Sequence, residues 1–213
     1  MTIIRKPDTA AEAHADHRDF VGGDGPMWDA IGRLQIDFLR SRGLAPHHRF
    51  VDVACGSLRG GLHFIRYLDP GRYTGVDKHI ELVIYGVAAE LGLDDFRVKT
   101  PHFVISDSFE FGKTEGGFHF GLAQSLFTHL TAADIFRCLV ELRKVCAPGC
   151  RFYATFFDSD APVANPNASH SHARFAYTPD EMTVLGNLAG WRSTPLGDWG
   201  HPRGQKMIEY VYP

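Results

Sequence analysis

The chain has 213 residues, 44% of them hydrophobic and 22% charged, and a formal net charge of −3. This length suits a single domain with a substantial core, and the composition is typical of a soluble globular protein. The absence of a basic excess argues against a nucleic-acid partner, because proteins that bind nucleic acids usually carry clustered positive charge. No stretch approaches about 20 apolar residues, so we expect no membrane span.

The N-terminal stretch and the cysteines bear on the cellular compartment. Charged residues interrupt residues 1–20 throughout, so we expect no signal peptide. The four cysteines form neither a CxxC pair nor the dense pattern of a small secreted domain. We therefore expect a reduced, cytoplasmic protein, either an enzyme or a binding domain. The two close pairs among the twelve histidines lack acidic or cysteine residues at zinc-ligand spacing, and we expect no metal.

Strands and helices are expected to alternate through most of the chain. Residues 1–23 are polar and of mixed charge and are predicted to form an N-terminal arm. A helix follows, capped by Asp24 and ended by Gly43. The next predicted elements are strand 49–54, helix 58–68, strand 73–76 ending on Asp77, helix 80–91, strands 102–106 and 118–123, a helix capped by Thr131 and closed by residues 147–149, and strand 151–157. This alternation predicts a layered α/β fold with a mostly parallel sheet.

The end of the chain departs from this alternation. A long polar loop, Ser159–Arg174, follows the fifth predicted strand. A helix comes next, with Thr178 as its cap and Pro179 in its first turn. Two extended segments, 191–196 and 205–211, then follow and are joined by a turn that contains glycine and proline. They are predicted to form an antiparallel hairpin at the end of the sheet.

The turn after the first predicted strand carries the strongest functional signal. An apolar run from Phe50 stops before Gly56, and a helix with two adjacent glycines, Gly60 and Gly61, begins directly afterwards. Such glycines indicate a ligand that approaches the backbone closely, and a helix N-terminus offers it unpaired N–H groups. In nucleotide-binding folds an acid about 20 residues later accepts hydrogen bonds from ribose hydroxyls, and Asp77 occupies that position.

The same turn lacks the signature of a phosphate-binding loop. It reads ACGSLRG and contains neither GxGxxG nor GxxxxGK[ST]. A pyrophosphate needs close backbone approach at several glycines, so a nucleoside without phosphates fits this turn better. Taken alone, the turn is also compatible with a purely structural role.

Five segments in order carry a resemblance to a known family: VDVACGSLRGG, YTGVD, FGLAQSLFTHL, LRKVCAPGCRFYATFF and HPRGQKMIEYV. Together they resemble the class I S-adenosylmethionine-dependent methyltransferases of the bacterial small-molecule type, over residues 24–213. The resemblance implies one methyltransferase domain with a Rossmann-like three-layer sandwich. Its seven-stranded, mostly parallel sheet would have the order 3-2-1-4-5-7-6, with the last strand antiparallel.

The resemblance also implies an activity and a set of contacts. The protein would transfer a methyl group from S-adenosylmethionine to a small-molecule acceptor by O- or N-methylation, release S-adenosylhomocysteine (SAH), and act as a monomer or homodimer. The implied cofactor contacts are Asp52, Ala54, Gly56 and Ser57 at the methionine end, Asp77 at the ribose, Lys78 or His79 beside the adenine, Asp107 at the adenine amino group, and Gln124 and Ser125 near the methyl group.

Three residues depart from the family pattern. The family usually has glycine where this chain has Ala54 and Leu58. Alanine is a small change, whereas Leu58 predicts that the helix begins sooner and that the loop is tighter. His119 stands where an acid often precedes the apolar run of the fourth strand, and it leaves the start of that strand open.

Several candidate residues also have an ordinary structural interpretation. Asp107, which lies between two serines, is equally typical of a capping turn, and helix capping is the alternative for Gln124 and Ser125. The catalytic candidates are His129, whose alternative is packing or support of a cap, and Asp158 at the end of the fifth strand. Methyl transfer depends on positioning and needs a base only for a weakly acidic hydroxyl or a protonated amine, so the sequence leaves the catalytic residue unknown.

The acceptor side is expected near the end of the fifth strand. Phe156 and Phe157 either shape an acceptor pocket or fill the core. The loop Ser159–Arg174, with His170 and His172, is interpreted either as a cover over the site or as a solvated segment. The HPRGQ segment favours a tight turn over a catalytic role.

Two other classes of function stay open. A nicotinamide-dependent Rossmann enzyme is disfavoured by the missing GxGxxG and by the terminal hairpin. A non-catalytic S-adenosylmethionine-binding domain that acts through a partner is disfavoured by the candidates at both the ribose and the methionine ends. The absence of GxSxG argues against an α/β hydrolase.

Overall fold

The computed structural model describes residues 17–18 and 25–213. Apart from His17 and Arg18, the arm predicted for residues 1–23 lies outside the described residues, as does the predicted cap, Asp24. Arg18 forms a two-pronged hydrogen-bonded ion pair with Glu90, at 2.7 and 2.6 Å. In the described part of the chain, no helix has the length and apolar character that crossing a membrane requires.

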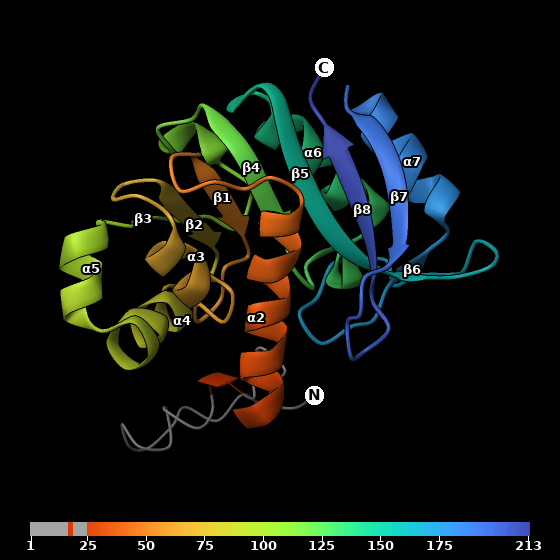
Figure 1. Ribbon diagram of the computed structural model, residues 1–213. Coiled ribbons are helices and arrows are strands. Elements are labelled where there is room, and N and C mark those ends of the chain that lie inside the picture. Colours follow the sequence, from red (N-terminus) through yellow and green to blue (C-terminus); the bar gives the residue numbers. More distant parts are fainter. Residues whose placement is uncertain (1–16, 19–24) are drawn as a thin grey trace.

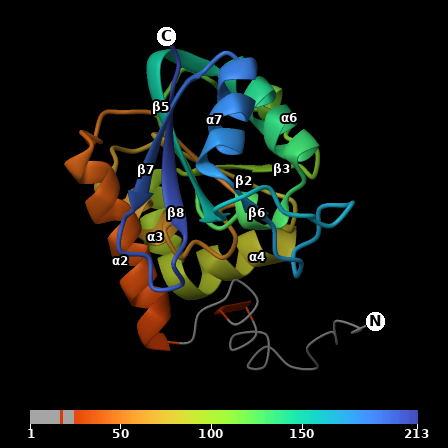
Figure 2. The ribbon, with the colours of Figure 1, turned by 90° about the vertical axis from the view of Figure 1, so that its right-hand side faces the viewer.

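A central sheet lies between two layers of helices (Figures 1 and 2). Along the sheet the strands are β3 (His102–Ile105), β2 (Tyr73–Asp77), β1 (Phe50–Val53), β4 (Phe118–Ala123), β5 (Cys146–Asp158), β8 (Lys206–Val211) and β7 (Arg192–Asp198). The first five strands pair in parallel, whereas β8 is antiparallel to both β5 and β7. The predicted order and the antiparallel last strand are confirmed. A two-residue strand, β6 (Ala176–Tyr177), pairs with the end of β5 and makes eight strands rather than seven.

The helices cover both faces of the sheet. They are α2 (Gly25–Ser41), α3 (Gly61–Tyr67), α4 (Ile80–Tyr85), the π-helix η1 (Gly86–Leu91), α5 (Leu93–Lys99), the short 3₁₀ turns η2 (Phe111–Lys113) and η3 (Phe127–His129), α6 (Ala132–Arg143) and α7 (Pro179–Leu188). The predicted caps of the last two helices are confirmed, because Thr131 accepts a hydrogen bond from the backbone of Asp134, and Thr178 forms a capping box with Glu181.

Alternate residues of the central strands point into two separate cores. All four residues of β1 are buried. Phe50 packs with residues of α2 and α3 on one face, whereas Val51 and Val53 pack with residues of α6 on the other. A strand covered on both faces has an almost continuous apolar sequence, which is why β1 was recognisable. Its polar exception, Asp52, is buried as well.

The junction between α6 and β5 differs from the prediction. The helix ends at Arg143 rather than at residues 147–149, and β5 begins at Cys146 rather than at Arg151. Cys146 pairs with Phe118, and the register then shifts before Phe120 pairs with Arg151. A strand tolerates proline and glycine at such an irregularity, so the sequence Ala-Pro-Gly marks a bulged strand entry here and not a helix end.

Candidate cofactor and acceptor site

The turn after β1 is built from left-handed backbone. Gly56 has a φ of 54°, and Ala54 and Leu58 have φ values of 62° and 66°. Glycine adopts this conformation without cost, whereas a residue with a Cβ is strained in it. The two positions where the family pattern has glycine are therefore positions that need a glycine-like backbone. The prediction that Leu58 begins the helix early is wrong, because Leu58 lies in the turn and α3 begins at Gly61.

The two adjacent glycines serve packing within the protein. A Cβ on Gly60 would lie 2.2 Å from Oε1 of Gln35, and one on Gly61 would lie 2.6 Å from the hydroxyl of Tyr73. Both distances are shorter than real Cβ contacts allow. The glycines thus let α3 pack closely against α2 and the sheet. Gly60 also lines the cavity at the carboxyl edge of the sheet, so the ligand expected there from the sequence stays a prediction.

A cavity of about 720 Å³ opens where β1, β2 and β4 end. Ligands of open α/β sheets bind at this carboxyl edge, and small-molecule sites commonly have roughly 300–1,000 Å³. All the cofactor contacts proposed from the sequence line this cavity: Asp52, Ala54, Gly56, Ser57, Asp77, Lys78, His79, Asp107, Gln124 and Ser125. The structure therefore brings together residues that the sequence spreads over four strand ends.

Asp77 joins the ends of the first two strands. Its Oδ2 accepts a hydrogen bond of 2.8 Å from the backbone N–H of Gly56, and its Oδ1 accepts one of 2.8 Å from the N–H of His79. The residue is only 7% exposed. Each carboxylate oxygen has a second lone pair, so Asp77 can still accept hydrogen bonds from ligand hydroxyls.

Asp52 and Arg59 both line the cavity, and an electrostatic interaction links them. Asp52 accepts a hydrogen bond of 2.8 Å from the hydroxyl of Tyr73. Burial raises the pKa of Asp52 to about 7, and the nearby charge of Asp77 adds to this. Burial also lowers the pKa of Arg59 to about 10, and Arg203 lowers it further. Arg59 and Arg203 line the cavity, and the sequence reasoning assigned neither of them to the site.

A network of amide and hydroxyl groups lines the cavity directly after the end of β4. Nε2 of Gln124 lies 3.0 Å from Oε1 of Gln205 and 3.1 Å from Nε2 of His201. Ser125, with a φ of 58°, donates its hydroxyl to Gln205 at 3.1 Å. Because β8 runs antiparallel, the turn before it lies at the carboxyl edge of the parallel strands. The HPRGQ segment is therefore both a turn and part of the cavity wall.

The two catalytic candidates lie in different places. Asp158 is exposed and outside the cavity lining. His129 lines the cavity, and its Nδ1 lies 2.6 Å from the carbonyl oxygen of Ala173. Burial lowers the pKa of His129, the hydrogen bond to Ala173 raises it, and electrostatic interactions with His172, Lys78 and His170 lower it further. Of these two candidates, only His129 lines the cavity.

The polar loop after β5 forms part of the wall. Residues 169–172 line the cavity, and the hydroxyl of Ser171 accepts a hydrogen bond of 3.0 Å from Nζ of Lys78. The hydroxyl of Ser169 accepts one of 2.9 Å from the backbone of Thr131. Arg174 instead stacks on Phe157, with its guanidinium carbon 4.1 Å from the ring centre. The end of the loop is therefore tied to the body of the protein beside the cavity.

Phe156 and Phe157, at the end of β5, lie in different surroundings. Phe157 lines the cavity, whereas Phe156 is fully buried in the core under α6 and α7.

Within residues 17–18 and 25–213, no group of three or more histidine, cysteine or acidic side chains is arranged to hold a metal ion.

Several solved structures are similar to this chain over nearly its whole length. Magnesium protoporphyrin IX methyltransferase from Synechocystis PCC 6803, with bound SAH, is 13% identical, with a TM-score of 0.64 and coverage of 93% of this chain and 94% of that one. DesVI from Streptomyces venezuelae is 18% identical, with a TM-score of 0.65 and coverage of 94% and 98%. The DhpI–SAH complex is 17% identical, with a TM-score of 0.66 and coverage of 94% and 93%. No protein-family model matches the chain.

The chain has the methyltransferase fold. At these sequence identities the likeness extends to the fold alone.

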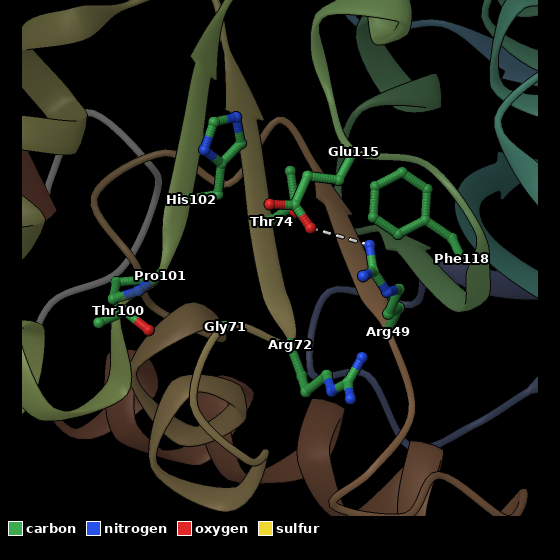
Figure 3. Close-up of a pocket in the computed structure, with 9 residues that line it drawn as sticks. All are labelled: Arg49, Gly71, Arg72, Thr74, Thr100, Pro101, His102, Glu115 and Phe118. Carbon is green, nitrogen blue, oxygen red and sulfur yellow. Dashed lines mark hydrogen bonds and ion pairs between the residues drawn. The ribbon is translucent and has the colours of Figure 1, made fainter.

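A second cavity, of about 250 Å³, lies at the opposite edge of the sheet, around the amino ends of β2, β3 and β4 (Figure 3). There Arg49 forms an ion pair of 2.9 Å with Glu115, and Arg72 and His102 are close by. None of the site residues expected from the sequence lines this second cavity.

Proposed function

We propose that this protein transfers a methyl group from S-adenosylmethionine to a small-molecule acceptor. The observation that carries the proposal is the convergence of every expected cofactor contact on one cavity at the carboxyl edge of the sheet. Its volume of about 720 Å³ suits a cofactor together with a small acceptor. When bound, S-adenosylmethionine supplies an electrophilic methyl group on a positively charged sulfur.

Unpaired polar atoms in the wall fit a polar ligand. Oε1 of Gln124 and Oγ of Ser57 are buried and have no hydrogen-bond partner among the described residues. A buried polar atom without a partner costs roughly 1–3 kcal/mol, so such atoms usually meet a ligand or water. Both residues line the cavity, and both belong to the contacts proposed for the methionine portion.

The charges in the wall match the two ends of the cofactor. In this proposal Asp77 accepts hydrogen bonds from the ribose hydroxyls, and Asp107 meets the adenine amino group. Asp52 faces the methionine amino group, and Arg59 and Arg203 face its carboxylate. These residues bind and orient the methyl donor, and orientation supplies much of the rate of a transfer reaction.

The cytoplasmic location and the monomer or homodimer state expected from the sequence remain predictions.

Calorimetric titration with S-adenosylmethionine, SAH and NAD tests the cofactor. We expect the first two to bind and NAD to bind far more weakly, because the turn after β1 has side chains at Ala54 and Leu58 and lacks GxGxxG. Preferential binding of NAD would contradict the proposal and favour a nicotinamide enzyme.

Incubation of metabolite extracts with isotopically labelled methyl donor then tests turnover. Tight binding without any transfer to these extracts would favour a non-catalytic binding domain.

A further inference from the structure

Phe157 is an aromatic residue of the cavity wall that lies outside the core. It is half-buried and lines the cavity at the carboxyl edge of the sheet, and it belongs to neither of the two cores formed by the described residues. Successive side chains of a strand point to opposite faces, and its neighbour Phe156 points into the core under α6 and α7. The ring of Phe157 therefore offers apolar surface to the cavity and not to the interior of the protein.

Arg174 holds this ring from the side away from the cavity. Its guanidinium carbon lies 4.1 Å from the ring centre of Phe157, and Arg174 is not among the residues that line the cavity. Within residues 17–18 and 25–213, no hydrogen bond or ion pair draws the guanidinium of Arg174 elsewhere. A planar guanidinium stacks on an aromatic face. One face of Phe157 is thus occupied, and the orientation of the ring is set before a ligand binds.

The ring lies on the side of the cavity that the expected cofactor contacts leave open. In the sheet, β4 stands between β1 and β5. The expected adenosine contacts, such as Asp77 and Asp107, lie at or just after the ends of β2 and β3, whereas Phe157 lies near the end of β5. Leu126 and Leu130 flank η3 and add apolar surface to the lining after β4. In the proposed function the acceptor meets this apolar surface, because the cofactor takes the side of β1, β2 and β3.

We infer that Phe157 is the platform on which a planar aromatic acceptor stacks, and that Arg174 is the positioning residue behind it. This inference rests on the proposed function and names the acceptor class. Aromatic rings pair in offset or edge-to-face arrangements, with centroids about 4.5–7 Å apart, and they gain more than burial alone provides. A cation on the far face attracts the π-electrons of Phe157, so the near face favours an electron-rich ring such as that of a phenol or an aniline.

Charged and titratable groups of both kinds border this surface, so charge does not select the acceptor. Asp134 is acidic, whereas Lys78, His129, His170 and His172 are basic, and all of them line the cavity. An acceptor is therefore recognised here by the shape and the π-electrons of its ring. Burial of its apolar atoms adds the usual gain for surface removed from water.

Saturation-transfer NMR of the SAH complex compares phenol with cyclohexanol, two neutral probes that share a hydroxyl group and differ in the planarity of the ring. A fragment of this size binds with a Kd in the millimolar range. We expect phenol to bind about 2- to 10-fold more tightly than cyclohexanol, the range that an aromatic pair adds to burial alone. Equal affinities, tighter binding of cyclohexanol, or no binding of either probe at millimolar concentrations would overturn the inference. Failure of SAH itself to bind in calorimetry would instead overturn the proposed function.

Three variants locate the preference for phenol on Phe157. Phe157→Leu keeps an apolar side chain but removes the ring, so the preference should vanish, whereas the Kd for SAH should stay at the wild-type value and show that the variant is folded. Phe157→Tyr retains the ring and should retain the preference. Phe136→Leu is the matched control, because Phe136 is exposed on α6 and lies outside the cavity lining. An unchanged preference in Phe157→Leu would refute the role of the ring.

Arg174→Gln tests the positioning role. Without the guanidinium stack the ring of Phe157 gains freedom, so we expect the affinity for phenol to fall by at least about twofold. The same change should leave the affinity for phenol unaltered in the Phe157→Leu background, where there is no ring to hold. An equal loss in both backgrounds would contradict positioning through Phe157.

Discussion

Oδ2 of Asp77 accepts a 2.8 Å hydrogen bond from the backbone N–H of Gly56, so the last residue of β2 holds the turn that follows β1. The same carboxylate binds the N–H of His79 at the start of α4. One buried acid thereby fixes both segments that border the predicted ribose position. Any residue except proline supplies such an N–H, so it is the φ of 54° and not this hydrogen bond that favours glycine at position 56.

Replacement of Asp77 by asparagine should weaken binding of S-adenosylmethionine. It removes the charge from hydrogen bonds to the ribose, which we expect to cost roughly 1.5–3 kcal/mol. Calorimetry measures the effect, with Asp158→Asn as the control because Asp158 lies outside the cavity lining. Equal affinity of Asp77→Asn and the wild type would refute the ribose assignment.

The strained turn predicts opposite results for two glycine variants. Ala54→Gly should stabilise the protein by about 0.5–1 kcal/mol, because the relief of left-handed strain exceeds the added freedom of the unfolded chain. Leu58→Gly relieves similar strain but empties a fully buried leucine site, so it should destabilise by about 2–4 kcal/mol. Urea unfolding gives both values. A loss of stability in Ala54→Gly would mean that its φ of 62° carries little strain.

The raised pKa of Asp52 predicts a pH dependence of stability. The folded protein binds a proton at Asp52 up to about pH 7, whereas an unfolded chain loses it near pH 4. Between these values the folded state holds more protons, so this group makes the free energy of unfolding fall as pH rises. We expect Asp52→Asn to gain stability relative to the wild type, on the order of 2–4 kcal/mol, as pH rises from 4 to 8. Parallel pH profiles of urea unfolding for the two proteins would contradict this.

The sequence predicts the sheet, and which residues line the cavity at its carboxyl edge, for one physical reason. Parallel strands covered on both faces are continuous apolar runs, and each ends at one edge of the sheet. A polar residue directly after such a run, such as Asp77 or Gln124, must therefore lie at that edge. The bulged start of β5 escaped prediction because its pairing with Phe118, through Cys146, is a contact between distant segments.

The missed wall residues depend on tertiary placement. Arg203 and Gln205 reach the cavity because β8 reverses direction, which makes its first turn meet the ends of the parallel strands. Arg59 follows the strained turn directly, and only the φ of Leu58 reveals how that turn bends. The antiparallel pairing of β7 and β8 places the HPRGQ turn at the carboxyl edge of the parallel strands.

The loop after β5 gives a final prediction, because only its end reaches the cavity. Residues 169–172 line the cavity, whereas residues 161–164 are exposed and do not. Replacement of residues 160–172 by a short Gly-Ser link should therefore lower kcat/KM for the acceptor more than tenfold, since part of the acceptor wall and the order around Ala173 are lost. The Kd for S-adenosylmethionine should change less than about threefold, because Asp52, Gly56 and Asp77 lie on other segments. Replacement of residues 161–164 alone is the matched control and should leave both values unchanged. Wild-type kcat/KM in the longer replacement would show that the acceptor is recognised elsewhere in the cavity.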